Sequence, residues 1–558
     1  MLKNKTTNLI SSILSVIIFG TLVTGCANVS NKNQNQSTKQ SLADNQLIRY
    51  NLGADPKTID PGLNDALYGG TVICNAFEGL MRLDSSDKPI PGAAEKYEVS
   101  SDQLHYTFHL RKDAKWSDGQ PVKASDFEYA WKRALDPNTA SPYAYQFYYL
   151  KNAEAYNTGK SKVDGVGVKA SDDNTLQVDL ENPTGYFLSL VAFPAYAPIR
   201  KDIVEKNPKD WATKPDTYVC NGPFKMKEWK AKDTLTFIKN DNYWNAKSVT
   251  LKQIDYRLLD DETAYMNAFK SGQIDFIETP PIAEIQSLIA SKTAAVYPYL
   301  GTYYLELNMD PAQAKLSDDA QKALKNVKVR EALSLAIDRK LLVEKVTKAG
   351  QKPATAFVPN GIPDPSTGKD FRQKDYYKAT ADVTKAKQLL SEAGYPDGKE
   401  FPKLEFLYNT SQSHGAVAQA IQDMWRQNLG INITLKNQEW AVFQTTRQNH
   451  QFAIARGGWI ADYTDPMTFL DIFTTGNGNN DPAYSSKDYD AKIAAARKES
   501  DAKKRMQDMH DAEDILMQDM PMIPLYFYTN IVCIKNNIKG FHKSPLGFVF
   551  FDAAYVTK

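Results

Sequence analysis

The stretch "QLHYTFHLRKDAKWSDGQPVKASDFEYAWKRAL", residues 103–135, carries two different apolar periods in succession. Alternate residues in its first part are apolar, which is the period of a half-buried β-strand. In its second part apolar residues recur at helical intervals, and Ser125 and Glu128 have the spacing of a capping box. The apolar positions are Leu104, Tyr106, Phe108 and Leu110, followed by Phe127, Trp131 and Leu135. The stretch therefore predicts a strand followed by a helix.

Further along the chain the same alternation continues. Residues 327–350 and 381–396 have helical patterns that we expect to stop at Gly350 and Gly394, because glycine favours helix C-termini. The segment "INITLKNQEW", residues 431–440, returns to a strand pattern. Strands interleaved with helices predict an α/β fold.

The length and composition of the chain limit its class. At 558 residues it is too long for one ordinary core, so we expect two or three lobes. It contains 42% hydrophobic and 24% charged residues, as folded globular proteins do, and its formal net charge is +1. This balance gives no electrostatic bias toward nucleic acid, and we expect no nucleic-acid partner.

The N-terminus has the pattern of an export signal. A basic head and an apolar body in residues 1–25 predict a signal peptide, and "LVTGCA" resembles the lipobox of bacterial lipoproteins, with Cys26 as the lipidated residue. An ordinary secretion signal with a chance cysteine is the alternative. Residues 26–46 are polar and predict a disordered tether. We expect an extracytoplasmic protein that is anchored by its lipid to the cell membrane, at the outer face or on the periplasmic side.

The sequence offers little that predicts catalysis, a metal or a cofactor. Three cysteines remain after Cys26, namely Cys74, Cys220 and Cys533, so at most one disulfide can form and a free buried thiol is expected. His105 and His109 are four apart, but in a strand that spacing separates them by roughly 13 Å, too far for one metal. The motifs GxSxG, GxxxxGK[ST], HExxH and CxxC do not occur. We expect a protein that is not an enzyme and that has no cofactor.

Residues 94–145 closely resemble the signature region of the family 5 extracellular solute-binding proteins. The resemblance continues through "CNGPFKMKEW", "PYLGTYYLELN", "LYNTSQSHGAVAQAIQDMWRQNLGINITLKNQEW" and "GGWIADYTDPMTFLDIF". The last two segments are similar to the oligopeptide-binding branch that serves ABC importers. The resemblance spans essentially the whole chain after the tether.

This resemblance implies a two-lobed α/β fold of the periplasmic-binding-protein type, which closes on its ligand like a flytrap. An extra domain is inserted in the first lobe. We place lobe I at residues 47–77, 198–300 and 527–558, the inserted domain at 78–197 and lobe II at 301–526.

The resemblance also implies where a peptide would bind. Asp462 matches the family position that holds the ligand ammonium, whereas the residue taken alone is also compatible with an Asx turn. Arg456 suits the ligand carboxylate, because its planar guanidinium binds two oxygens at once. His414 matches a position near the C-terminus of short ligands, and Asn409 matches a position close to the peptide.

The segment around Arg456 also offers backbone and aromatic surface. Gly457 and Gly458 leave the backbone unshielded, so that an extended ligand can add to it as a strand. Ile460 lies in the same segment and is also a candidate ligand-binding residue. Trp459 is a candidate pocket wall, or else a core residue.

The facing lobe and the inserted domain complete the predicted site. The loop "DPGLNDALYGG", residues 60–70, matches the family loop that contributes main-chain bonds and an acidic side chain. Asp65 stands at the acidic position, where a longer glutamate is familiar, and Leu67 would contribute backbone. Tyr143 and Tyr145 match positions where the inserted domain lines the cleft.

The function implied is a substrate-binding receptor that captures peptides of about two to five residues by their termini and backbone. It would deliver them to a membrane permease with cytoplasmic ATPases, and we expect it to be a monomer. Two alternatives remain: a narrow-specificity receptor for signalling or cell-wall peptides, and a surface chaperone or adhesin. A flat affinity profile across side chains would exclude the first, and dependence on a free ligand N-terminus would exclude the second.

Overall fold

The computed structural model describes residues 41–558, of which 42–558 form one compact unit. The predicted signal peptide, Cys26 and most of the predicted tether lie outside the described residues. No helix within the described part is both long and apolar enough to cross a membrane.

The strand and the helix predicted in residues 103–135 both form. Strand β5 is His105–Leu110, with Tyr106 and Phe108 buried, and helix α2 is Ala124–Leu135. His105 and His109 bond to Asp179 and Glu98 respectively, as separate surface pairs.

The predicted cap of α2 was wrong. Lys123 is the N-cap, and the Asp126 carboxylate accepts a hydrogen bond from the Lys123 amide at 2.9 Å. Ser125 lies inside the helix. Glu128 instead accepts from Lys132 at 2.6 Å and from the Ala170 amide at 2.8 Å, which ties the helix to the neighbouring strand.

The single helix predicted for residues 327–350 is broken. Helix α9 is Val327–Leu335, and a new start at Asp338, whose carboxylate caps the Leu341 amide, gives α10 at Arg339–Leu341 and a π-helical turn at Leu342–Thr347. Helix α11, Val383–Glu392, ends before Gly394 as expected, and β18 is Ile433–Gln438.

The first large sheet has seven strands within residues 41–558. Its central strand β1 is parallel to both neighbours, whereas the outer pairs are antiparallel. Helices α6 (Glu262–Lys270) and α7 (Ile285–Ala290) pack against strands of this sheet. The strand order is β12 (Ala294–Tyr297), β21 (Asn530–Ile534), β11 (Phe276–Glu278), β1 (Leu47–Asn51), β10 (Gln253–Arg257), β9 (Thr234–Lys239) and β8 (Phe224–Lys230).

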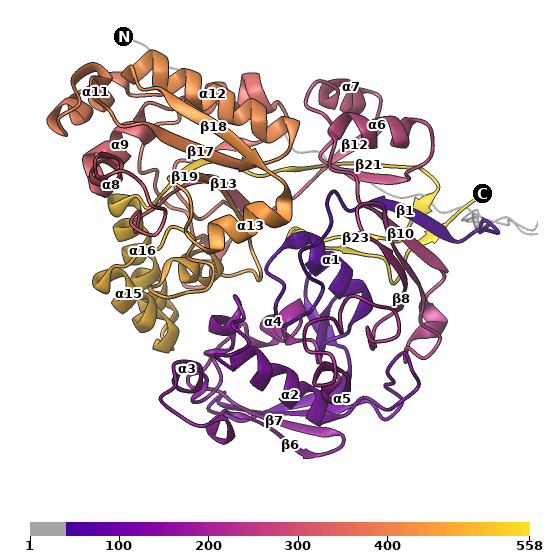
Figure 1. Ribbon diagram of the computed structural model, residues 1–558. Helices are drawn as coiled ribbons and strands as arrows, with labels where there is room; N and C mark the ends of the chain where they lie inside the picture. Colours follow the sequence, from indigo (N-terminus) through magenta and orange to yellow (C-terminus); the bar gives the residue numbers. More distant parts are fainter. Residues whose placement is uncertain (1–40) are drawn as a thin grey trace, which may run out of the picture. The chain divides into compact units, whose positions relative to one another are not determined.

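The second large sheet has six strands in the described part of the chain. Helices α12 (Gln412–Leu429) and α13 (Trp440–Gln448) pack on β17 and β18, and α11 packs on α9 and α12 (Figure 1). The strand order is β14 (Lys352–Pro353), β20 (Met522–Phe527), β13 (Gly301–Leu307), β19 (Ile454–Ile460), β17 (Leu404–Asn409) and β18.

Two short links join the sheets. The chain passes from β12 to β13 through residues 298–300 and from β20 to β21 through residues 528–529. The predicted two-lobed α/β fold is confirmed, and the aromatic rings of Tyr299 and Tyr528, one in each link, lie 5.5 Å apart.

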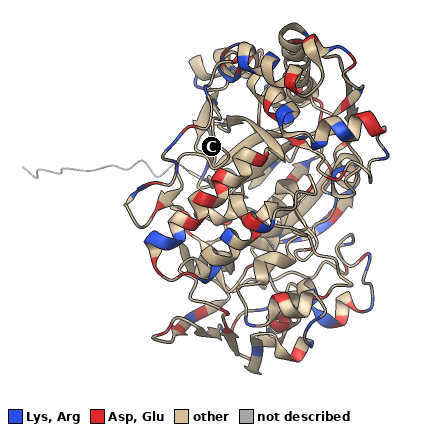
Figure 2. Cartoon of the chain, turned by 90° about the vertical axis from the view of Figure 1, so that its left-hand side faces the viewer, with Lys and Arg blue, Asp and Glu red and all other residues tan. Residues whose placement is uncertain are grey.

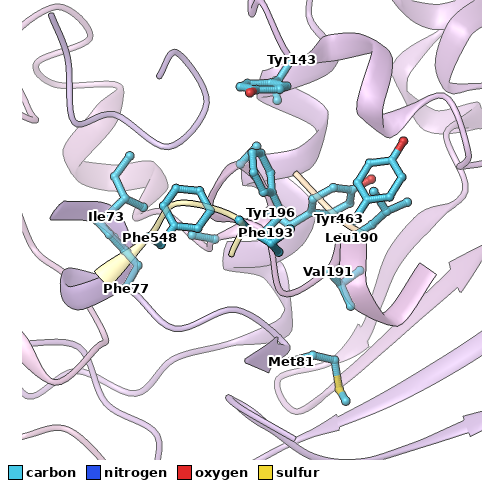
Figure 3. Close-up of a cluster of buried hydrophobic side chains, with 14 of the residues drawn as sticks. Ile73, Phe77, Met81, Tyr143, Leu190, Val191, Phe193, Tyr196, Tyr463 and Phe548 are labelled. Carbon is cyan, nitrogen blue, oxygen red and sulfur yellow. The ribbon is translucent and has the colours of Figure 1, made fainter. Parts of the chain in front are cut away.

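A third, four-stranded sheet lies between α1 (Leu67–Ala76) and β8 in the chain. Its strands are β4 (Ala94–Val99), β5, β7 (Thr175–Asp179) and β6 (Val168–Asp172). Residues after this sheet join the first lobe through a buried aromatic cluster, in which Phe193 lies between Tyr143 and Phe548 at centroid distances of 5.2 and 6.0 Å (Figure 3). The inserted segment therefore shares a core with the first lobe.

Charged residues of both signs are interspersed over the visible helices, strands and loops (Figure 2). Cys74, Cys220 and Cys533 are all free thiols. The expectation of a free buried thiol is therefore confirmed, for both Cys220 and Cys533.

Candidate functional site

A cavity of about 350 Å³ lies where the two lobes and the inserted segment meet. Its wall includes the loop before α1, the first turn of α12, the helix α13, strand β19 and the link between β20 and β21. Ten of the eleven predicted ligand-binding residues line it, and Tyr145 does not: the ten are Asp65, Leu67, Tyr143, Asn409, His414, Arg456, Gly458, Trp459, Ile460 and Asp462.

Strand β19 carries most of the predicted site. It pairs along its full length with β13, and the Ala461 amide just beyond it donates to the Leu300 carbonyl. Because backbone bonds alternate along an antiparallel pair, Arg456, Gly458 and Ile460 point their N–H and C=O groups away from β13.

The opposite edge of β19 is partly open. Strand β17 pairs with β19 opposite Ile454 and Ala455 and then turns away into α12. Gly457 bonds toward β13, and a side chain there would meet Tyr304, so in contrast to our expectation it does not belong to the open edge. The open edge therefore consists of Gly458 and Ile460, because the parallel Leu407–Ala455 pair uses the Arg456 N–H and the Arg456 carbonyl accepts from Arg447 Nη1 at 3.4 Å.

Asp462, two residues after β19, is a buried carboxylate with neutral partners. Tyr143 Oη donates to Oδ1 at 3.1 Å and Gln146 Nε2 donates to Oδ2 at 2.6 Å. Among residues 41–558 no cationic side chain forms an ion pair with it. Burial raises the pKa of the Asp462 carboxyl well above its ordinary value, although these two hydrogen bonds act in the opposite direction. A buried carboxylate of this kind is stabilised by an incoming cation.

Arg456 is the complementary group on the same strand. Its Nη2 donates to Tyr528 Oη at 3.0 Å, its Cζ lies 5.0 Å from the centre of the Tyr303 ring, and Nε has no hydrogen-bond partner in the described part of the chain. Tyrosine rings and hydroxyls surround this guanidinium, and no carboxylate within residues 41–558 pairs with it. It can therefore accept an anion from a ligand.

His414 and Asn409 lie beside Arg456 in the wall. His414 Nδ1 is 3.2 Å from Tyr303 Oη. Burial, and then the neighbouring Arg456 cation, lower the pKa of His414 well below its ordinary value, so the imidazole is neutral at pH 7. Asn409 is buried, and its Oδ1 has no partner among the described residues. His414 therefore offers hydrogen bonds rather than a positive charge.

Asp65 reaches across the cavity to the other lobe. Gln444 Nε2 donates to its Oδ1 at 3.2 Å and Gln448 donates to its Oδ2. Burial raises the pKa of Asp65. Leu67 begins α1 and lines the cavity beside it. The shorter acidic side chain thus makes an interlobe contact with α13.

The predicted aromatic residues divide between the wall and the core. Trp459 is 8% exposed, and its ring centre lies 6.3 Å from that of Tyr143. Tyr145 is buried behind Tyr143, with their ring centres 5.9 Å apart, and its hydroxyl lies 3.5 Å from Asn479 Nδ2. Tyr145 therefore supports the wall from behind.

Comparison with known proteins assigns the chain to a family. The family model described as bacterial extracellular solute-binding proteins, family 5 middle, matches residues 88–481. The chain belongs to the family 5 extracellular solute-binding proteins.

Its relatives cover the chain almost completely. The oligopeptide-binding protein OppA of Bacillus subtilis is 39% identical over 555 residues, or 98% of this chain and 99% of that protein. A Bacillus anthracis structure, described as the substrate-binding domain of an oligopeptide ABC transporter, has a TM-score of 0.87 at 36% identity and covers 93% of this chain and 100% of its own. Listeria monocytogenes OppA bound to peptide has a TM-score of 0.86 at 32% identity and covers 92% and 100%. The predicted family and fold are confirmed.

The sequence did not indicate three further residues that contribute to the site of this solute-binding protein. Gln146 from the inserted segment holds Asp462, Tyr528 from the link holds Arg456, and Glu262 of α6 accepts from Ser411 Oγ at 2.7 Å and from the Ser413 amide at 2.8 Å. Each meets a partner more than 70 positions away in the chain. No local pattern of residues could have indicated these contacts.

Proposed function

We propose that the chain is the substrate-binding receptor of an ABC importer and captures short peptides in the cavity between its lobes. The observation that carries the proposal is a buried anion, Asp462, and a buried cation, Arg456, that line one cavity without ionic partners in residues 41–558. A peptide supplies both missing charges, its ammonium to Asp462 and its carboxylate to Arg456. The relatives described as oligopeptide-binding support this reading.

The open edge of β19 would hold the ligand backbone. Gly458 and Ile460 present N–H and C=O groups that a peptide can pair with as an added strand. Main-chain bonds are the same for every sequence, so they bind peptides without regard to side chains. Asn409 and Trp459, each with an unpartnered polar atom among the described residues, can complete this set.

The spacing of the two charges limits ligand length. Positions 456 and 462 are six steps apart along the chain, which corresponds to about 20 Å at most in an extended backbone. The arginine side chain shortens this distance, and each ligand residue spans about 3.4 Å, so ligands of about two to five residues fit.

We also propose a membrane anchor and a membrane partner for the protein. Cys26 would carry the lipid that anchors the protein, as a monomer, to the outer face of the cell membrane. The tether would end before Leu42, earlier than the predicted residues 26–46, because Leu42 pairs with Thr557 and the buried Gln46 donates to the Val556 carbonyl. A permease with cytoplasmic ATPases would receive the peptide, and the protein itself would catalyse no reaction.

We further propose that lobe I is residues 47–77, 198–300 and 527–558, that the inserted domain is 78–197, and that lobe II is 301–526. The membership of strands in the sheets supports these borders. Every strand of the seven-stranded sheet falls in the first set, and every strand of the six-stranded sheet falls in the last except for Phe527, the final residue of β20.

The test compares trialanine with N-acetyl-trialanine by isothermal titration calorimetry, after the protein has been unfolded and refolded to remove co-purified ligand. We expect tight binding of trialanine and binding of the acetylated form weaker by at least about a hundredfold. Equal binding of both would refute terminal recognition and favour a chaperone or adhesin. Recovery of intact peptide at the end would support the absence of hydrolysis.

A further inference from the structure

The direction of a bound peptide follows from the position of Asp462. This residue lies beyond the C-terminal end of β19, so a ligand with its ammonium there runs along the open edge from Ile460 toward Arg456. The line of that edge continues into the end of β17 at Asn409 and the first turn of α12. The carboxyl end of a longer ligand therefore points at the N-terminus of α12.

An N-terminus of this kind normally attracts a carboxylate. Helix α12 has 18 residues, and unpaired backbone N–H groups with the helix dipole favour an anion at its start. In this protein that place is taken. Glu262, 5% exposed and from the opposite lobe, accepts from the Ser413 amide at 2.8 Å and from the Ser411 hydroxyl at 2.7 Å.

The surroundings reinforce the negative charge. Asp260 also lines this end of the cavity, and no lysine within residues 41–558 does. Of the two arginines in the wall, Arg447 already pairs with Asp481 and lies 3.5 Å from Glu306. Arg456 is thus the cation available to a ligand carboxylate.

Because burial keeps His414 neutral, it adds no positive charge beyond Arg456. A carboxylate that extends past Arg456 would meet Glu262 and Asp260 in a partly dehydrated space. Like charges a few ångströms apart in such a space repel strongly.

We infer that Glu262 sets an upper limit on ligand length by occupying the anion position at the N-terminus of α12. This inference rests on the proposed function and specifies its ligands. Free-acid peptides whose carboxylate stops at Arg456 bind best. Longer peptides bind only where their C-terminus carries no negative charge.

The test measures the affinity of the purified full-length chain for alanine peptides, from the dipeptide to the heptapeptide, each as the free acid and as the C-terminal amide. At the optimal length the acid should bind at least about tenfold more tightly than the amide, because the amide cannot pair with Arg456. Beyond that length the order should reverse by at least about tenfold.

Two variants test whether the charge of Glu262 causes the weaker binding of long free-acid peptides. Glu262→Gln keeps an acceptor for Ser413 and removes the charge, so it should strengthen the binding of long acids at least about tenfold and leave the amides within about threefold. Asp261→Asn is the matched control. Asp261 is the exposed N-cap of α6, does not line the cavity, and can be replaced by asparagine as a cap. It should change neither series.

Two results would overturn the inference while leaving the proposed function intact. In one, the affinities of acids and amides fall in parallel with length. In the other, Glu262→Gln shifts acids and amides alike, which would make Glu262 merely an interlobe contact. Binding of no alanine peptide at any length would overturn the proposed function and the inference together.

Discussion

Replacement of Asp462 by asparagine tests the central charge of the site. The side chain is 8% exposed, and both carboxylate oxygens are held by neutral donors from the inserted segment. Asparagine has nearly the same shape but cannot pair with an ammonium. A bound peptide would then bury its ammonium without a counter-charge.

The expected magnitude follows from this burial. Removing one partner of a buried ion pair costs about 3 to 5 kcal/mol, and each 1.4 kcal/mol is tenfold in affinity. Asp462→Asn should therefore weaken the binding of trialanine between about a hundredfold and a few thousandfold. N-acetyl-trialanine, which has no ammonium, should bind the variant at least as tightly as wild type, because the variant buries no unpaired carboxylate.

Calorimetry of both ligands against both proteins measures this double difference. Asp488→Asn, an exposed aspartate in the first turn of α15 (Lys487–Lys498), controls for the loss of one carboxylate elsewhere. A loss of less than about tenfold for trialanine would show that Asp462 does not hold the ammonium. A loss shared equally by the acetylated peptide would mean that the substitution damages the fold of the cavity.

Three further predictions address the rest of the site. Arg456→Met should weaken the binding of a free-acid tripeptide at least about thirtyfold in calorimetry and should leave the affinity for its C-terminal amide within about threefold. An equal loss for both peptides would show that Arg456 has a structural role only. Without peptide, Asp462→Asn should raise the melting temperature at neutral pH. Folding raises the pKa of the Asp462 carboxyl, so this group destabilises the folded protein increasingly as pH rises through the interval from the unfolded to the folded pKa. That gain should vanish at pH values below this interval, and a gain independent of pH would contradict the reasoning. Gly457→Ala places a methyl group 2.4 Å from the buried Tyr304 ring and should destabilise the protein by about 1 to 3 kcal/mol in urea, whereas Gly185→Ala, with open space around it, should be neutral.

The features best predicted from the sequence are those that depend on local apolar periodicity or on the family resemblance. The strand His105–Leu110 follows from alternating apolar residues, and the helix stop before Gly394 follows from the left-handed backbone that glycine adopts there. Ten of the eleven predicted ligand-binding residues line one cavity, because most of them belong to two continuous segments of the chain.

Alternative helix caps explain the two wrong predictions of secondary structure. Lys123 displaced Ser125 as the cap of α2, because Asp126 could bond back to the Lys123 amide while Glu128 served the strand beside it. The break in the helix predicted for residues 327–350 follows from Asp338, whose carboxylate caps a new helix start. Both corrections depend on which of several similar polar residues makes the cap, and spacing alone cannot decide this.

Long-range contacts explain what the sequence could not show. Gln146 meets Asp462 across 316 positions and Glu262 meets Ser411 across 149. Neither residue stands in a distinctive local pattern. Their roles arise when the lobes and the inserted segment come together, so they become visible in the fold and not before.

Ligand capture and lobe closure depend on the same groups. Asp462 belongs to the second lobe, but its hydrogen-bond donors Tyr143 and Gln146 come from the inserted segment. Separation of the lobes would remove these donors and expose Asp462 to water. When the lobes close without a ligand, a carboxylate is buried without a cation, which is costly. An ammonium removes that cost in the closed form alone, so peptide binding must shift the equilibrium toward closure. A blocked N-terminus would fill the cavity without this shift, and such a ligand should bind without stabilising the closed form.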